Sequence, residues 1–173
     1  MIQVGDALPD VTLMEFVETE GEGCRIGPRP VPVRAEAAGK TIALFAVPGA
    51  FTPTCSAQHV PGYLQRHDEL RAAGVDEIWC VSVNDVFVMG AWARDQGCAG
   101  KVRMLADGSA AFARATGLTL DLTDRGLGLR SNRYSMLVQD GVVRTLNVEG
   151  PGEFAVSDAD TLLAQARRLQ GAA

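Results

Sequence analysis

The architecture of this protein follows from one apolar segment, Thr41-Ile-Ala-Leu-Phe-Ala-Val47, which ends at Pro48 and Gly49. A continuous apolar run closed by two turn residues is typical of a strand that is covered on both faces of a sheet. We therefore expect 41–47 to be a central strand, with a turn and a loop directly after it.

The segment after this loop predicts a helix. Residues Cys55 to Ala73 carry apolar or aromatic side chains at helical spacing, and Gly74 supplies a stop. Pro61 interrupts the pattern and predicts a kink, because a proline inside a helix removes one backbone hydrogen bond. The local order is therefore strand, loop and helix.

Two more strand and helix pairs follow along the chain. Ile78-Trp-Cys-Val-Ser-Val83 has the pattern of a buried strand, and Asn84-Asp85 can cap a helix over 86–96. Weaker signals predict a strand over Val102 to Leu105 and a helix over Ser109 to Thr116. Such alternation predicts parallel strands joined by helices that lie on both faces of the sheet.

The last third of the chain predicts a hairpin and a final helix. Tyr134 to Gln139 and Val142 to Val148 flank Asp140-Gly141, a two-residue turn signal that makes the sheet mixed. The final helix is expected over Asp158 to Leu169, with Ser157 as its cap and Asp160 three residues later.

The length and the composition predict one α/β domain over residues 1–173. At 173 residues, 47% hydrophobic and 21% charged, the chain can bury a single core. The Gly- and Pro-rich segment from Glu20 to Pro32 is expected to be a surface loop. The order of the elements describes a thioredoxin-like fold, with a mixed central sheet and helices on both faces.

Charge and patterning exclude several classes of function. A net charge of -5 with scattered basic residues argues against nucleic acid as a partner, and the apolar runs are far shorter than the roughly 20 residues that a membrane helix needs. The two histidines and four cysteines include no closely spaced pair of metal ligands. No secretory signal pattern is present at the N-terminus, so a cytoplasmic location is expected.

Cys55 is the candidate nucleophile. A cysteine reacts as the thiolate, which a helix N-terminus and nearby donors stabilise. An isolated cysteine is more often a small buried apolar residue. Cys55, however, follows a loop that Pro48 and Pro53 restrict and that Gly49 allows to bend, and Thr52 can place a hydroxyl near a ligand of the sulfur. This context favours the reactive interpretation.

The spacing Pro48-x-x-x-Thr52-x-x-Cys55 resembles the active-site motif of the peroxiredoxins. The wider stretch from Val47 to Tyr63 resembles the branch that holds the plant type II and the mammalian atypical two-cysteine enzymes, among the AhpC/TSA-like thiol peroxidases. Four further segments resemble this branch in the same order, namely Val81–Asp85, Lys101–Asp107, Arg130–Met136 and Asn147–Phe154.

The resemblance implies a peroxidase without cofactor or metal that reduces hydrogen peroxide and alkyl hydroperoxides through a cysteine sulfenic acid, in redox homeostasis and antioxidant defence. Without the resemblance, Arg133 would be interpreted as a solvated or salt-bridged surface residue. The roles implied are attack by Cys55, peroxide binding by Thr52 and Arg133, and shielding of the sulfur by Pro48. Phe51 is expected to line an apolar wall of the substrate site, with a purely structural role as the equal alternative, and Thr54 is a further candidate for substrate binding.

The return of the sulfenic acid to the thiol stays open. The segment Gly152–Ser157, where the mammalian enzymes place a second cysteine, contains none. Cys80 stands where plant type II members carry a cysteine to which a resolving role has been assigned, but its pattern favours a buried strand residue. Cys24 and Cys98 are expected to be more exposed. The default is a one-cysteine cycle with glutathione and glutaredoxin, or thioredoxin, as reductant.

Other functions would need a different motif or would use the same cysteine in another way. A disulfide oxidoreductase needs Cys-x-x-Cys, whereas Pro53-Thr54 precede Cys55 and Ser56-Ala57-Gln58 follow it. A redox sensor or holdase would use the same cysteine and stays possible. His59 could support the thiolate but is assigned no catalytic role. The resemblance also implies a homodimer that forms through the face near the active site.

Overall fold

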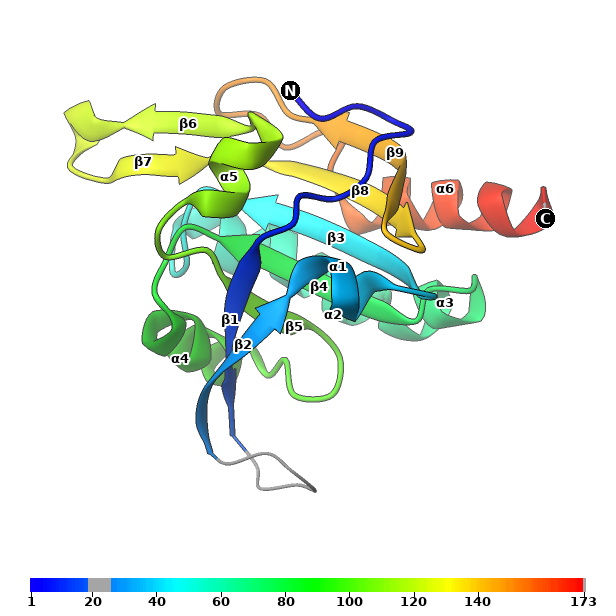
Figure 1. Cartoon of the computed structure of the whole chain (residues 1–173), viewed down its shortest axis with the longest axis horizontal. Helices are drawn as coiled ribbons and strands as arrows, with labels where there is room; N and C mark the ends of the chain where they lie inside the picture. The colour runs from blue at the N-terminus through cyan, green and yellow to red at the C-terminus, as the bar shows by residue number, and fades with distance from the viewer. Residues whose placement is uncertain (19–25, 173) are drawn as a thin grey trace.

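A computed structural model describes residues 1–18 and 26–172 of the chain. Within these residues, a seven-stranded mixed sheet has the order β2-β1-β5-β4-β3-β8-β9 (Figure 1). β4 pairs in parallel with both β3 and β5, and the other neighbours are antiparallel. The strands are β1 (Thr12–Val17), β2 (Gly27–Pro32), β3 (Thr41–Val47), β4 (Glu77–Ser82), β5 (Arg103–Ala106), β8 (Tyr134–Gln139) and β9 (Val142–Val148).

Helices cover both faces of this sheet, as predicted (Figure 1). Phe45 and Val47 of β3 pack with α2, α3, α4 and α6, whereas Ile42 and Leu44 pack with α1 and α5 on the opposite face. Alternate side chains of β3 therefore enter two cores, which explains its unbroken apolar pattern. The helices are α1 (Val33–Ala37), α2 (Val60–Gln65), α3 (His67–Ala72), α4 (Val86–Gln96), α5 (Ala111–Thr116) and α6 (Ala159–Gly171).

Elements with strong local signals lie where the sequence predicts them. β3, α4, β8 and β9 have the predicted bounds, and the Asp85 carboxylate caps α4 by accepting from the Val88 N–H at 2.9 Å. Asp140 and Gly141 both have positive φ angles, as the hairpin turn requires. β4 and β5 are each shifted by one residue, and α5 begins two residues later than predicted. Every helix in the described ranges is too short or too polar to cross a lipid bilayer.

The predicted surface loop from Glu20 to Pro32 is wrong where the structure describes it. Residues 27–32 form the edge strand β2, which pairs antiparallel with β1, while 20–25 lie outside the described residues. Pro28, Pro30 and Pro32 alternate along β2, so the missing N–H groups all belong to its outer side, and the residues between them can still donate to β1.

Another antiparallel pair was not predicted. β6 (Thr119–Leu122) and β7 (Gly128–Ser131) form a separate two-stranded sheet joined through a 3-10 turn, η2 (Thr123–Arg125). Neither strand has a long apolar run, because most of their residues are only partly buried. This pair stands beside the end of the main sheet where β3 and β4 finish (Figure 1).

The predicted helix over 55–73 is divided into three parts. A π-helical turn, η1 (Cys55–His59), precedes α2, and Arg66 separates α2 from α3. In the π turn the Val60 N–H donates to the Cys55 carbonyl, one residue further back than in an α-helix. Pro61 follows at once and has no N–H to continue the regular ladder. The irregularity thus lies before the proline rather than as a kink within one helix, and Gly74 ends α3 as expected.

The predicted cap of the last helix is also wrong. Asp158, not Ser157, caps α6, since its carboxylate accepts from the Thr161 N–H at 3.2 Å. The Ser157 hydroxyl instead donates to Glu149 at 2.7 Å. The cap pattern covers only residues next to the helix start, whereas Glu149 lies eight residues before Ser157 and contacts it only in the folded chain.

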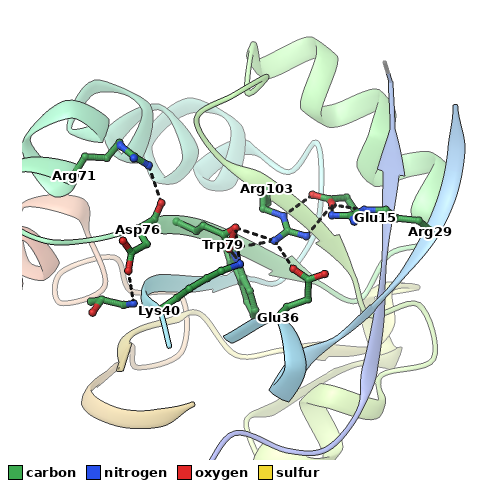
Figure 2. A network of polar contacts seen from close by, with 10 residues as sticks. Glu15, Arg29, Glu36, Lys40, Arg71, Asp76, Trp79 and Arg103 are labelled. Atoms are coloured by element: carbon green, nitrogen blue, oxygen red, sulfur yellow. Dashed lines mark hydrogen bonds and ion pairs between the residues drawn. The ribbon is translucent and has the colours of Figure 1, made fainter. Parts of the chain in front are cut away.

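Arg103 of β5 joins several elements at the edge of the sheet that lies far from β9 (Figure 2). Its guanidinium lies within 3.2 Å of carboxylate oxygens of Glu15, Glu36 and Glu77, which belong to β1, α1 and β4. Glu15 also accepts from Arg29 of β2 at 2.8 Å. The Arg103 side chain is only 19% exposed, so water and salt screen these contacts less than at an open surface.

Candidate active site

The loop between β3 and η1 holds the candidate site at the carboxyl ends of the parallel strands. Its bend has a positive φ of 63° at Phe51, not at Gly49 as the sequence suggested. At Gly49 space is tight instead, because a Cβ there would lie 3.1 Å from the Thr52 methyl group, which would have to shift. The Ala50 N–H donates to the Asn84 side chain at 2.9 Å, and the Thr52 hydroxyl donates to the Gly49 carbonyl at 2.7 Å.

Cys55 lies in the first turn of the helix that follows this loop. Helical structure begins at Pro53, and the Ser56 N–H donates to the Thr52 carbonyl at 3.0 Å. The N–H groups of a first helical turn have no acceptor within the helix, so they form an electropositive end close to the Cys55 sulfur. The cysteine itself is fully buried. The predicted placement of Cys55 at a helix start therefore agrees with the structure.

Arg133 contacts the Cys55 sulfur across 78 residues of sequence. Its Nη2 lies 3.1 Å from Sγ, while its Nη1 lies 2.8 Å from Nδ1 of His59. The guanidinium also stands over the ring of Phe154, 5.8 Å from the centroid. A positive group at hydrogen-bond distance stabilises a thiolate, so this contact is the main electrostatic feature of the site.

His59 is buried behind Arg133. Its Nε2 lies 3.0 Å from the Ser157 carbonyl oxygen, and the Tyr63 hydroxyl donates to the same oxygen at 2.9 Å. Burial, followed by the charge of Arg133, lowers the pKa of His59 to about 3, so the imidazole is neutral near pH 7.

A cavity of about 470 Å³ opens beside this cluster. Four of the predicted site residues line it, and Leu120, Leu122 and Leu127 of the β6–β7 segment add an apolar wall to the same cavity. Phe51 is not among the lining residues; its side chain is 52% exposed and its ring lies 6.3 Å from that of Trp92. The predicted residues that meet at the cavity are Pro48, Thr52, Thr54 and Arg133.

The other described cysteines are buried free thiols. Cys80 is fully buried on β4, and burial raises its pKa well above the ordinary value. Cys98 is only 1% exposed, so its expected exposure is wrong: after Gly97 the chain turns back, and the Cys98 N–H donates to the Ala93 carbonyl. Burial raises the pKa of Cys98 to about 12. Cys24 lies outside the described residues.

Three residues that support the site were not identified as site residues from the sequence. Asn84 holds the loop at Ala50, Arg130 donates to the Val83 carbonyl at 3.0 Å, and the Glu149 carboxylate accepts from three N–H groups of residues 155–157. Burial raises the pKa of Glu149, but the hydrogen bonds from Ser157 and the backbone outweigh it and hold the pKa below its usual value. All three residues stand in the segments that carry the family resemblance, which was the available signal.

Comparison with known proteins places the chain among relatives of one kind. A family model described as Redoxin matches residues 3–163. The chain is 48% identical over 162 residues to Peroxiredoxin-2B of Arabidopsis thaliana, covering 94% of this chain and 96% of that protein. It is 49% identical over 164 residues to the chloroplastic Peroxiredoxin-2E of the same plant, covering 94% and 68%.

Solved structures agree with the sequence relatives. Reduced Prx3 from Vibrio vulnificus in complex with H2O2 has a TM-score of 0.89 at 48% identity, covering 98% of each chain. A structure from Burkholderia cenocepacia, named provisionally as a thioredoxin reductase, has a TM-score of 0.94 at 65% identity, covering 95% of this chain and 97% of that one. The thioredoxin-like fold predicted from the element order is thereby confirmed. The match extends over nearly the whole chain, and this protein belongs to the peroxiredoxin family, in its type II branch, as a thiol peroxidase with an antioxidant role.

Proposed function

We propose that Cys55 is the peroxidatic residue of this thiol peroxidase. The observation that carries the proposal is the 3.1 Å contact between the Arg133 guanidinium and the Cys55 sulfur, beside a cavity that Pro48, Thr52 and Thr54 line. The thiolate attacks one oxygen of the peroxide, so that an S–O bond forms as the O–O bond breaks. The sulfur is oxidised to a sulfenic acid, and the leaving alkoxide or hydroxide takes a proton to become an alcohol or water.

Thr52 and Arg133 bind the peroxide in this proposal. The Thr52 hydroxyl donates its hydrogen to the Gly49 carbonyl, so its oxygen can accept a hydrogen bond from the hydroxyl group of the peroxide. Arg133 stabilises both the thiolate and the charge that develops on the leaving oxygen. Pro48 and Thr54 exclude water from the sulfur. Phe51 does not line the cavity, so any contact that it makes with the substrate is at the outside of the site. The apolar wall of Leu120, Leu122 and Leu127 accommodates an alkyl group.

We propose a one-cysteine cycle for the return of Cys55 to the thiol. An external thiol condenses with the sulfenic acid and releases water, and a second thiol reduces the mixed disulfide, which gives the oxidised external disulfide. Glutathione with glutaredoxin is the reductant that similarity to type II members favours, and thioredoxin is the alternative. A resolving role for Cys80 is less well supported, because this residue lies within β4 between two paired strands, and a bridge would require the sheet to open.

The wider setting is proposed on the same basis. Residues 1–173 act as one domain, and a homodimer forms through the face near the active site, where Phe51 is exposed. The free thiols of Cys55, Cys80 and Cys98 suit a reducing compartment such as the cytoplasm. A thioredoxin reductase activity, which the name of the Burkholderia relative suggests, is not supported, since the four cysteines form no Cys-x-x-Cys pair.

Steady-state peroxide consumption by Cys55→Ser, with Cys80→Ser and Cys98→Ser as matched controls, tests these roles. Each variant is supplied in turn with glutathione plus glutaredoxin and with thioredoxin. Cys55→Ser is expected to lose all turnover, and the two controls are expected to keep it with at least one reductant. Full activity of Cys55→Ser would refute the assignment of the nucleophile. Rapid oxidation of the wild type without repeated turnover on either reductant would favour a sensor instead.

A further inference from the structure

We infer that His59 is a positioning residue, a neutral imidazole held in one tautomer that aims the Arg133 guanidinium at the Cys55 sulfur. The inference rests on the proposed role of Cys55 and extends it to a residue that does not touch the substrate. His59 is fully buried and contacts Arg133 on one side and the chain after β9 on the other.

The two contacts of the ring assign its proton. A guanidinium can only donate, so the 2.8 Å contact from Arg133 Nη1 requires His59 Nδ1 to be an unprotonated acceptor. A carbonyl can only accept, so the 3.0 Å contact to Ser157 requires a proton on Nε2. Each nitrogen therefore has one role, and neither the other tautomer nor the imidazolium can satisfy both partners.

The segment after β9 fixes the carbonyl that selects this tautomer. Glu149 accepts from the N–H groups of Ala155, Val156 and Ser157, and from the Ser157 hydroxyl at 2.7 Å. These bonds fold residues 150–157 into a turn that directs the Ser157 carbonyl at His59. The rings of Phe45 and Phe154 lie 4.7 and 4.8 Å from the imidazole and restrict its rotation. The imidazole is thus held by Phe45 of β3 on the side of the sheet and by Phe154 and Ser157 on the side of the turn.

The neutrality of His59 matters for the charge that reaches the sulfur. A carboxylate in this position would also accept from Arg133, but it would offset the positive charge of the guanidinium beside a thiolate. A neutral imidazole orients Arg133 and leaves that charge intact. Burial and the charge of Arg133 keep the pKa of His59 at about 3, in agreement with this arrangement. The charged side chains that face the ring are Arg133 and, further away, Glu149.

Two substitutions of His59 separate positioning from packing. His59→Phe keeps an aromatic ring between Phe45 and Phe154 but removes the acceptor, whereas the amide oxygen of His59→Gln can accept from Arg133 again. The same change in the other histidine, His67→Phe on α3, is the matched control. The measurements are the second-order rate constant with H2O2, the pH midpoint of Cys55 alkylation by iodoacetamide, and thermal unfolding.

His59→Phe is expected to lower the rate constant about 10- to 100-fold and to move the alkylation midpoint upward by roughly one pH unit, as for the loss of one charge-assisted hydrogen bond. His59→Gln is expected to recover most of both, and His67→Phe to change neither. An unchanged alkylation midpoint in a folded His59→Phe protein would overturn the inference. So would a His59→Gln protein that is as impaired as His59→Phe.

A measurement on the wild type avoids any question of folding. Nitrogen-15 spectra of the imidazoles are assigned with the His67 and His59 variants, since the chain has two histidines. His59 is expected to show the Nε2–H tautomer from pH 5 to pH 8, and a protonated Nδ1 contradicts the inference. This result and the alkylation midpoint require no peroxide. Failure of the peroxidase proposal, seen as an active Cys55→Ser protein, is therefore distinguishable from failure of the role of His59.

Discussion

Cys55 and Cys80 are both fully buried in the same core cluster, but their surroundings differ. Cys80 stands within β4 between Phe45 of β3 and Met104 of β5, and burial raises its pKa. Cys55 stands where a loop meets a helix, with the Arg133 guanidinium 3.1 Å from its sulfur. Exposure therefore does not separate the two thiols. The Arg133 guanidinium, which also lines the cavity, lies beside Cys55, and this contact supports the proposal that Cys55 is the thiol that reacts with peroxide.

Removal of the cation should have the largest effect. Arg133→Met keeps much of the side-chain volume but leaves the Cys55 sulfur without its positive neighbour, so the rate constant with H2O2 should fall roughly 10²- to 10³-fold. Stopped-flow mixing with peroxide measures it. Arg144→Met, at an exposed position of β9, is the control. Equal losses in the two proteins would mean that Arg133 has no special role.

Removal of one hydroxyl should have a smaller effect. Thr52→Val retains the shape of the side chain but loses the oxygen that is proposed to accept from the peroxide. The rate constant should fall about 10- to 100-fold, the range for a hydrogen bond to a charged or reacting group. Thr54→Val makes the same change at a residue that lines the cavity but is proposed only to exclude water, so a smaller loss is expected there. A greater loss in Thr54→Val than in Thr52→Val would reverse the assigned roles.

At alkaline pH, the buried thiols of Cys80 and Cys98 should lower the free energy of unfolding. Burial raises the pKa of Cys80 and that of Cys98, the latter to about 12, so the folded protein keeps both protons while the unfolded chain loses them near pH 9. These two groups make their full contribution to the free energy of unfolding below pH 9. That contribution decreases as the pH rises, by roughly 2–3 kcal/mol at pH 10. Urea unfolding of the wild type and of Cys80→Ala/Cys98→Ala measures it. The double variant should lack this part of the decline, and identical declines would contradict the assignment.

The smallest effect is expected for Cys80 at neutral pH. Cys80→Ala removes a buried sulfur from the core and should lower the free energy of unfolding by about 1 kcal/mol. Peroxide turnover with glutathione and glutaredoxin, or with thioredoxin, should be unchanged. Loss of turnover with both reductants in a protein of normal stability would instead make Cys80 the resolving cysteine.

Sequence patterns correctly predicted the features that depend on residues close together in the chain. The apolar run of β3, the Asp85 cap of α4 and the Asp140-Gly141 turn each depend on residues that are close in sequence, and the structure confirms them. The family motif pointed to Pro48, Thr52 and Cys55, and the wider resemblance pointed to Arg133; the structure brings the four residues together. The role of each in catalysis stays a prediction.

The errors arose where distant contacts decide. β2 carries three prolines and resembles a loop until β1 is present to pair with it. Cys98 follows a glycine turn but is packed into the core by the return of the chain toward α4. The contact of Arg133 with His59 spans 74 residues, and no spacing rule relates the two. Ser157 matched the cap pattern because a serine stands just before the helix. In the folded chain its hydroxyl instead donates to Glu149, on the other side of a turn.

The prolines of β2 also limit how copies of this protein can associate. Along 28–32 the outer side of this strand has no N–H group to offer, so a strand from another molecule cannot form a regular ladder there. At the opposite edge, the N-terminal residues exchange backbone hydrogen bonds with β9, from Gly5 to Val143 and from Val143 to Asp6. The β2 edge therefore resists pairing with a strand of another molecule along 28–32, and the β9 edge is covered where Gly5 and Asp6 pair with Val143.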